Sequence, residues 1–261
     1  MRVPVATVSG RRLESIFPQA VGSATGWLLV AVSAFTSFVT AAFGIGGGVL
    51  LLAVMGLSMP PAALIPVHGV VQIGANAGRL VLMLRHVTLP VLLPFGIGGL
   101  LGAALGGRLV VALPAAVLDL ALGCFVLYSV WGRFPRLAGP FAVAGTGAFS
   151  SFLTMFVGAT GPFVAAMLKT MELDRRAHVA TQAACMSLQH LLKVSTFGLL
   201  GFAYGDYAVL IALMIASGLL GTAIGTHLLE RRSDTGFHRV LSVLLTVLAL
   251  RLIYEGLAGL V

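Results

Sequence analysis

Ser37-Phe38-Val39-Thr40 begins a pattern that occurs twice in this chain. The second copy, Ser151-Phe152-Leu153-Thr154, lies 114 residues further on (151 − 37). Each copy is followed by two glycines at the same spacing, which are Gly44 and Gly47 in the first copy and Gly158 and Gly161 in the second. A single match would carry little weight in a sequence this rich in small apolar residues, so the rest of the chain must show the same relation.

Two further matches extend the repeat. The same offset carries Arg79 onto Lys193, and these are the basic residues that lie deep within long apolar stretches. A later Gly-Leu-Leu-Gly block that begins at Gly99 recurs at Gly218, with an offset of 119 residues (218 − 99). Matches in the same order at nearly the same offset predict a duplicated unit of roughly 115 residues, a plan that many secondary transporters follow. We therefore expect Gly44 to superpose on Gly158 and Arg79 on Lys193.

Composition places the chain in a membrane. Of its 261 residues, 59% are hydrophobic and 9% are charged, whereas a soluble domain carries about 25% charged residues. Runs such as residues 87–107 and 207–229 contain no charge, and each is as long as the roughly 20 residues that cross a bilayer as a helix. They lack the alternation of a membrane barrel. The predicted class is all-α: a polytopic transmembrane helical bundle of two homologous halves.

The apolar segments divide the chain into a polar N-terminal tail (1–25), a first transmembrane repeat (26–132) and a second one (138–261). The first segment of each repeat, at 26–57 and 138–169, is too long for one crossing, since about 32 residues would span about 48 Å against a core of about 30 Å. Glycine-rich stretches interrupt both segments. We therefore predict two half-length helices in each, joined at a non-helical break at Gly44 to Gly48 and at Gly158 to Pro162.

Loop charge tests the number of crossings. The net charge of +8 comes from Lys and Arg that concentrate in short loops, which is typical of cytoplasmic loops and gives no reason to expect a nucleic-acid partner. With eight simple crossings, Arg85 and Arg133 fall inside, whereas Arg175 and Arg231 fall outside, against the positive-inside rule. If the broken segment of the second repeat crosses and returns, both violations are repaired, and if both broken segments do so, the two halves are inverted. We expect eight to ten membrane segments.

Polar residues form one stripe on each of two corresponding helices. A cation at the centre of a bilayer costs about 2.5 to 3.5 kcal/mol, so we expect both stripes to face a shared, protein-enclosed cavity. The alternatives are that Arg79 extends to the membrane surface, that the amides only join helices, and that His68 is a hydrogen-bonded core histidine. The stripes, with residues three, four or seven apart, are His68, Gln72, Asn76 and Arg79 in the first repeat and Gln182, Gln189 and Lys193 in the second.

The glycine-rich breaks supply a second ingredient of an anion site. An interrupted helix exposes backbone N–H groups and the positive end of a half-helix dipole, which together accept an anion. The alternative is that the glycines only allow close helix contact, and this is our interpretation of the separate ridges around Gly102 and Gly221. The substrate-binding residues that we predict at the breaks are Gly44, Gly46, Gly47, Gly48, Gly158, Thr160 and Gly161.

These residues also carry a resemblance. Phe43-Gly44-Ile45-Gly46-Gly47-Gly48, the polar helix that follows, the Gly-Leu-Leu-Gly block and the second, degenerate copy resemble the TauE/SafE family, also called the sulfite exporter family. The resemblance covers nearly the whole chain after the N-terminal tail. It implies transport of sulfite, sulfoacetate or another small sulfur-containing or organic anion across the cytoplasmic membrane. We therefore predict a secondary transporter of a small anion.

Other function classes remain to be weighed. An enzyme is not expected, because the chain has no H-E-x-x-H motif and no cluster among its eight Asp and Glu residues. An anion channel is the main alternative, since a basic pore would also explain Arg79 and Lys193, and a structural scaffold would need neither cation. The expected partners are the anion and membrane lipid, without a cofactor or metal. A homo-oligomer and proton coupling through His68 or His190 stay open.

Overall fold

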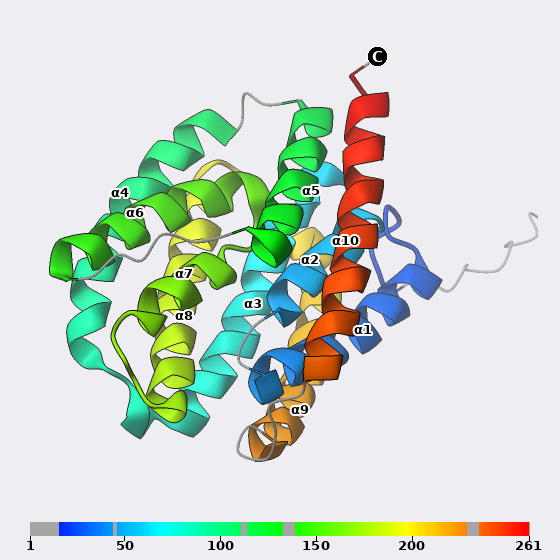
Figure 1. Cartoon of the computed structure of the whole chain (residues 1–261). Helices are drawn as coiled ribbons and strands as arrows, with labels where there is room; N and C mark the ends of the chain where they lie inside the picture. Colours follow the sequence, from blue (N-terminus) through cyan, green and yellow to red (C-terminus); the bar gives the residue numbers. More distant parts are fainter. Residues whose placement is uncertain (1–15, 44–45, 111–113, 133–138, 229–234, 261) are drawn as a thin grey trace, which may run out of the picture.

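The structure is a computed structural model that describes residues 16–43, 46–110, 114–132, 139–228 and 235–260. Helices form throughout these ranges, and no strand occurs within them (Figure 1). The predicted all-α class is confirmed. Gly44, Arg133 and Arg231 lie outside the described residues. In chain order the α-helices are α1 (Ser23–Phe43), α2 (Gly47–Gly56), α3 (Pro61–Met83), α4 (Leu92–Val110), α5 (Ala115–Trp131), α6 (Pro140–Val157), α7 (Gly161–Lys169), α8 (Arg175–Leu199), α9 (Ala208–Leu228) and α10 (Thr235–Ala258), with the 3-10 turns η1 (Leu84–His86), η2 (Leu89–Val91) and η3 (Tyr204–Tyr207).

Five of the described helical stretches are long and apolar enough to cross a membrane, as a polytopic bundle requires. The helix α8 is also long enough, since 25 residues span about 37 Å, but its polar stripe makes it less apolar. The count of eight to ten segments stays a prediction. The five stretches are Ser23–Phe43, Pro61–His86, Leu89–Val110, Pro140–Val157 and Tyr204–His227.

The long first segment of each repeat differs from the prediction of two half-length helices. It consists of a full-length helix followed by a short one: α1 and α2 have 21 and 10 residues, and α6 and α7 have 18 and 9. At 1.5 Å per residue, α1 is about 31 Å long, which is enough for a whole crossing. The short helices cannot cross a bilayer by themselves.

The breaks are also shorter than predicted. The prediction made four residues non-helical that are in fact helical. Gly47 and Gly48 form the first turn of α2, and Gly161 and Pro162 form the first turn of α7. A proline at the start of a helix has its backbone angle preset and lacks an N–H that would go unpaired there. The described break residues include Gly46, with φ at 100°, and Gly158, with φ at 75°. Only glycine adopts these angles without strain.

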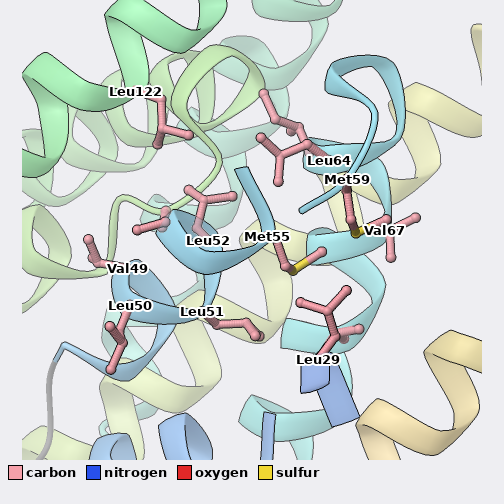
Figure 2. Packing of buried hydrophobic residues seen from close by; sticks show 14 of the residues in the cluster. Leu29, Val49, Leu50, Leu51, Leu52, Met55, Met59, Leu64, Val67 and Leu122 are labelled. Carbon is pink, nitrogen blue, oxygen red and sulfur yellow. The ribbon is translucent and has the colours of Figure 1, made fainter. Parts of the chain in front are cut away.

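The short helix α2 is enclosed by protein. Its residues Val49 to Ala53 are at most 3% exposed, so side chains on every face are buried. Figure 2 shows these side chains surrounded by Leu29 of α1, Leu64 and Val67 of α3, and Leu122 of α5. A helix that is apolar on all sides is stable only when it is covered on all sides. The start of α2 is therefore held within the bundle.

Glycines allow two helix pairs to approach backbone to backbone. A Cβ atom added at Gly98 or Gly102 of α4 would lie 1.9 Å from the carbonyl oxygen of Ala144 or Ala148 of α6. A Cβ atom at Gly221 of α9 would lie 2.0 Å from a carbonyl oxygen of α1. These distances confirm that both ridges are packing faces. The pair α4 and α6 joins the two predicted repeats, as does the pair α1 and α9.

The helices that carry the polar stripes run antiparallel. Met83 at the end of α3 packs with Val179 and Ala180 at the start of α8, and Gly69 lies against Lys193 further along both helices. The end of α3 and the start of α8 therefore lie at the same, lower end of the molecule (Figure 1). This arrangement is the one that inverted halves require, although their superposition stays a prediction.

The packing of α4 against α6 generates the first test. We predict that Gly102→Ala lowers the stability of the purified protein by about 1 to 3 kcal/mol, because the methyl group must push the two backbones apart. Gly145→Ala on α6 is the matched control, since a Cβ atom there meets nothing within 4 Å and alanine favours helix. Thermal unfolding in detergent measures both. Equal midpoints for the two variants would contradict this packing.

Candidate functional site

A cavity of about 40 Å³ lies where the starts of α2 and α7 meet the polar stripes of α3 and α8. One water needs about 10 to 15 Å³, and a drug-sized ligand needs about 300 to 1,000 Å³. The space therefore suits a small ion. Its lining residues come from both predicted repeats and are Thr40, Gly46, Gly48, Val49, His68, Gln72, Asn76, Arg79, Ala159, Gly161, Pro162, Gln182, Met186 and His190.

Arg79 is the cation that lines the cavity. Its side chain is 3% exposed, and its Nη1 donates to the carbonyl oxygen of Thr40 at 3.2 Å. Its Nη2 donates to Oδ1 of Asn76, whose Nδ2 in turn donates to the carbonyl oxygen of Gln72 at 2.8 Å. Its Nε has no partner among the described residues. The guanidinium is therefore positioned by neutral oxygens, and the N–H group of Nε stays available for a ligand.

His68 links the polar stripe to the start of α2. Its Nε2 lies 3.1 Å from the carbonyl oxygen of Gly48 and 3.2 Å from Nε2 of Gln72. One ring nitrogen cannot donate to the carbonyl and accept from the amide in the same protonation state. The rings of His68 and His190 are 6.0 Å apart, and Nδ1 of each has no partner in the described part of the chain. These two nitrogens are available to a ligand or a proton.

The second stripe holds the other break. Nε2 of Gln182 donates to the carbonyl oxygen of Gly161 at 3.3 Å, and Nζ of Lys193 donates to that of Gly158 at 2.9 Å. Nε2 of Gln189 donates to Oγ1 of Thr160 at 2.7 Å. Lys193 and Gln189 do not line the cavity, and they contact the chain that borders it. The hydrogen bonds of Lys193 and Gln182 satisfy backbone carbonyl groups where α6 ends and α7 begins, and Gln189 holds the side chain of Thr160 there.

Within the described part of the chain, the buried cations Arg79 and Lys193 lack acidic partners. Lys193 is 0% exposed, and neither Lys193 nor Arg79 forms an ion pair with a described residue. An ion pair between Nε of Arg251 and Oε1 of Glu255, at 3.0 Å, does form, but it lies on the surface. A buried charge is costly when only neutral groups surround it. An anion in the cavity would supply the missing opposite charge beside Arg79.

The starts of α2 and α7 both border the cavity. No side chain caps either helix, so the first N–H groups have no partner within the helix. In α2 these groups belong to Gly47, Gly48 and Val49, whereas in α7 the second residue is Pro162, which has no N–H. Uncapped helix starts attract anions. The contribution of α2 is the larger one.

The predicted site residues fall into two groups. Gly44 lies outside the described residues. The group that lines the cavity is Gly46, Gly48, His68, Gln72, Asn76, Arg79, Gly161 and Gln182. The group that supports the lining from behind is Gly47, Gly158, Thr160, Gln189 and Lys193. The predicted stripes and breaks are thus brought together, while their binding of a substrate stays a prediction.

Sequence reasoning missed several residues of the site. Thr40, which positions Arg79, belongs to the repeated stretch that opens the pattern. His190, which the sequence suggested for proton coupling but not for the lining, is where the offset of 114 residues places Asn76, so that offset indicated its place in the lining. No pattern indicated Gly69, where a Cβ atom would lie 2.8 Å from Cε of Lys193, or Arg175, whose Nη2 donates to the carbonyl oxygen of Ala42 at 3.3 Å. That last contact places a cation at the end of α1, where it is stabilising.

Comparison with known proteins identifies one family. The sequence model of a family described as sulfite exporter TauE/SafE matches residues 29–252. This range includes every residue of the cavity lining. No curated protein and no solved structure matches the chain.

The two breaks generate a matched pair of substitutions. A Cβ atom at Gly47 would lie 1.8 Å from the carbonyl oxygen of Thr36, whereas one at Gly161 meets nothing closer than Nε2 of Gln182 at 3.9 Å. We predict that Gly47→Ala lowers the thermal stability, because backbone must move. Gly161→Ala should unfold like the parent but bind a small oxyanion more weakly, because its methyl group enters the cavity. Unchanged binding by Gly161→Ala, measured by calorimetry, would contradict this site.

Proposed function

This chain belongs to the sulfite exporter TauE/SafE family, and we propose on that premise that it is a secondary transporter of sulfite or a closely related oxyanion. The anion binds in the cavity between the starts of α2 and α7 and crosses the cytoplasmic membrane. The five long apolar stretches support a multi-pass membrane protein. The cavity supports a site enclosed by protein.

The observation that carries the proposal is the environment of Arg79. This guanidinium is buried, lines the cavity, has no acidic partner among the described residues and keeps an unpaired Nε. Guanidinium forks and backbone N–H groups are the donors that bind oxyanions best. Nε of Arg79, the N–H groups at the start of α2 and the amide of Gln72 would surround the oxygens of a bound sulfite.

The size of the cavity bears on the choice of substrate. About 40 Å³ favours a small inorganic oxyanion, and sulfoacetate would require the lining to move apart. The apolar lining residues Val49, Ala159 and Met186 form part of the cavity wall. These walls strengthen the attraction between an anion and the cation, because they exclude water.

A carrier fits this arrangement better than a channel. Most of the lining residues are buried, and the starts of two short helices border the space. A channel needs a continuous path, whereas a carrier needs one enclosed site that opens to each side in turn. Antiparallel α3 and α8, which both contribute polar residues to the lining, offer two halves that can rock about the site.

Removing the cation of the cavity tests the site. We predict that Arg79→Gln weakens sulfite binding about 10- to 150-fold, because a charged hydrogen bond contributes about 1.5 to 3 kcal/mol. Lys193→Gln should weaken binding less, since Lys193 donates to Gly158 behind the lining. Calorimetry on purified protein measures both, with the exposed cation of Arg108→Gln as the control. If Arg79→Gln binds sulfite like the parent, Arg79 is a structural residue.

Counterflow separates a carrier from a channel. We predict that vesicles containing the protein take up labelled sulfite faster when they are loaded with unlabelled sulfite, because the loaded site returns more readily than the empty one. The uptake should also saturate with sulfite concentration. A sulfite conductance without counterflow would show that the protein is a channel.

A further inference from the structure

A second basic site lies at the end of the bundle where α3 ends, α8 begins and α9 ends. It is a pocket of about 300 Å³ that shares no lining residue with the anion cavity. Nε of Arg85 donates to Nε2 of His86 at 3.2 Å, so the two side chains are held together. The pocket is lined by Leu82, Met83, Arg85, His86, Arg176, Ala223, Thr226 and His227.

An apolar groove of about 500 Å³ continues from this pocket along α3 and α9. The two spaces share Leu82 and Ala223, so they form one depression with a basic end and an apolar length. The groove is lined by Gly74, Ala77, Gly78, Val81, Leu82, Leu219, Thr222 and Ala223. Thr222 is its polar residue, and it is buried.

The groove faces the surroundings of the bundle. Val81 is 74% exposed, Leu82 58% and Leu219 42%, and both helices are among the stretches that can cross a membrane. Residues 74 to 82 cover about 12 Å along α3, which is most of the roughly 15 Å that one leaflet of hydrocarbon occupies. On α3, Gly74 and Gly78 lie on the face opposite Asn76 and Arg79. An acyl chain fits this groove in both length and chemistry.

From these features we propose that the depression binds an anionic phospholipid. The phosphate lies in the basic pocket, where Arg85 and Arg176 provide charge, and one acyl chain lies in the groove. A free anion would make no use of the groove, and an uncharged lipid would make no use of the pocket. The lipid satisfies both, which is why the proposal commits to it.

Charge at this end of the bundle agrees with the proposal. Asp174 is an acidic side chain near His86 and Arg176, and its carboxylate accepts the N–H groups of Ala177 at 2.9 Å and Arg176 at 2.8 Å. These hydrogen bonds, together with the positive charges of His86 and Arg176, hold the pKa of Asp174 below its usual range. The basic loops mark this end as cytoplasmic, where leaflets carry anionic lipid.

Lipid titration of the delipidated full-length protein, followed by native mass spectrometry, tests the proposal. We expect phosphatidylglycerol to bind more tightly than phosphatidylcholine. Arg85→Gln should weaken phosphatidylglycerol binding about fivefold, and the double variant with Arg176→Gln about 25-fold, if each cation contributes as basic residues do near membranes. Phosphatidylcholine binding should not change. Arg85→Lys should keep most of the preference, and Arg108→Gln, an exposed cation at the far end of α4, should keep all of it.

The groove has its own variant. Ala223→Trp places a bulky side chain where the pocket and groove meet, and it should weaken the binding of both lipids. Because Ala223 and Arg85 are exposed, these variants should unfold like the parent. Equal affinity for the two lipids in the parent, or an unchanged preference in the double variant, would overturn the proposal. Displacement of the lipid by inorganic phosphate, without an effect of Ala223→Trp, would also overturn it and show a pocket for free anions.

Discussion

The structure depends on a buried guanidinium that has no acidic partner among the residues that the structure describes. Arg79 lies inside the bundle, and the groups that position it are the carbonyl oxygen of Thr40 and the side chain of Asn76. Such an arrangement is costly in a protein that has nothing to bind there. The rest of the site is suited to an anion that would compensate this charge, since two uncapped helix starts and a row of amides converge on the same small space. A bound anion would offset the cost of burying the guanidinium, and this gain would contribute to the binding free energy.

Close backbone contacts make this convergence possible. Gly47 brings the start of α2 against Thr36 of α1, and Gly102 brings α4 against Ala148 of α6. Gly69 leaves room for the stem of Lys193, so the ammonium group reaches the carbonyl oxygen of Gly158. In a bilayer, helix association relies on such packing because lipid is as apolar as the side chains. The glycines therefore shape the site by allowing the helices that form it to approach closely.

Much of the fold and of the site could be predicted from the sequence, because polar residues within a membrane-spanning helix must face the interior of the protein. Gln72, Asn76 and Arg79 share one helical face, and burial of that face follows from the cost of lipid exposure. The position of Lys193 behind the lining could not be predicted, since it depends on the reach of a flexible side chain past Gly69 of another helix. The predicted helix lengths at the breaks were also wrong, because the spacing of glycines in the sequence does not show where a helix restarts after a glycine turn.

A diffraction measurement tests the central claim most directly. Selenite has the shape and charge of sulfite, and selenium scatters anomalously, so crystals of the protein soaked in selenite report the position of a bound anion. The account predicts a selenium peak in the cavity, within hydrogen-bond distance of Nε of Arg79 and next to the starts of α2 and α7. A cavity without selenium, in crystals whose selenium peaks lie only in the basic pocket around Arg85, would contradict it.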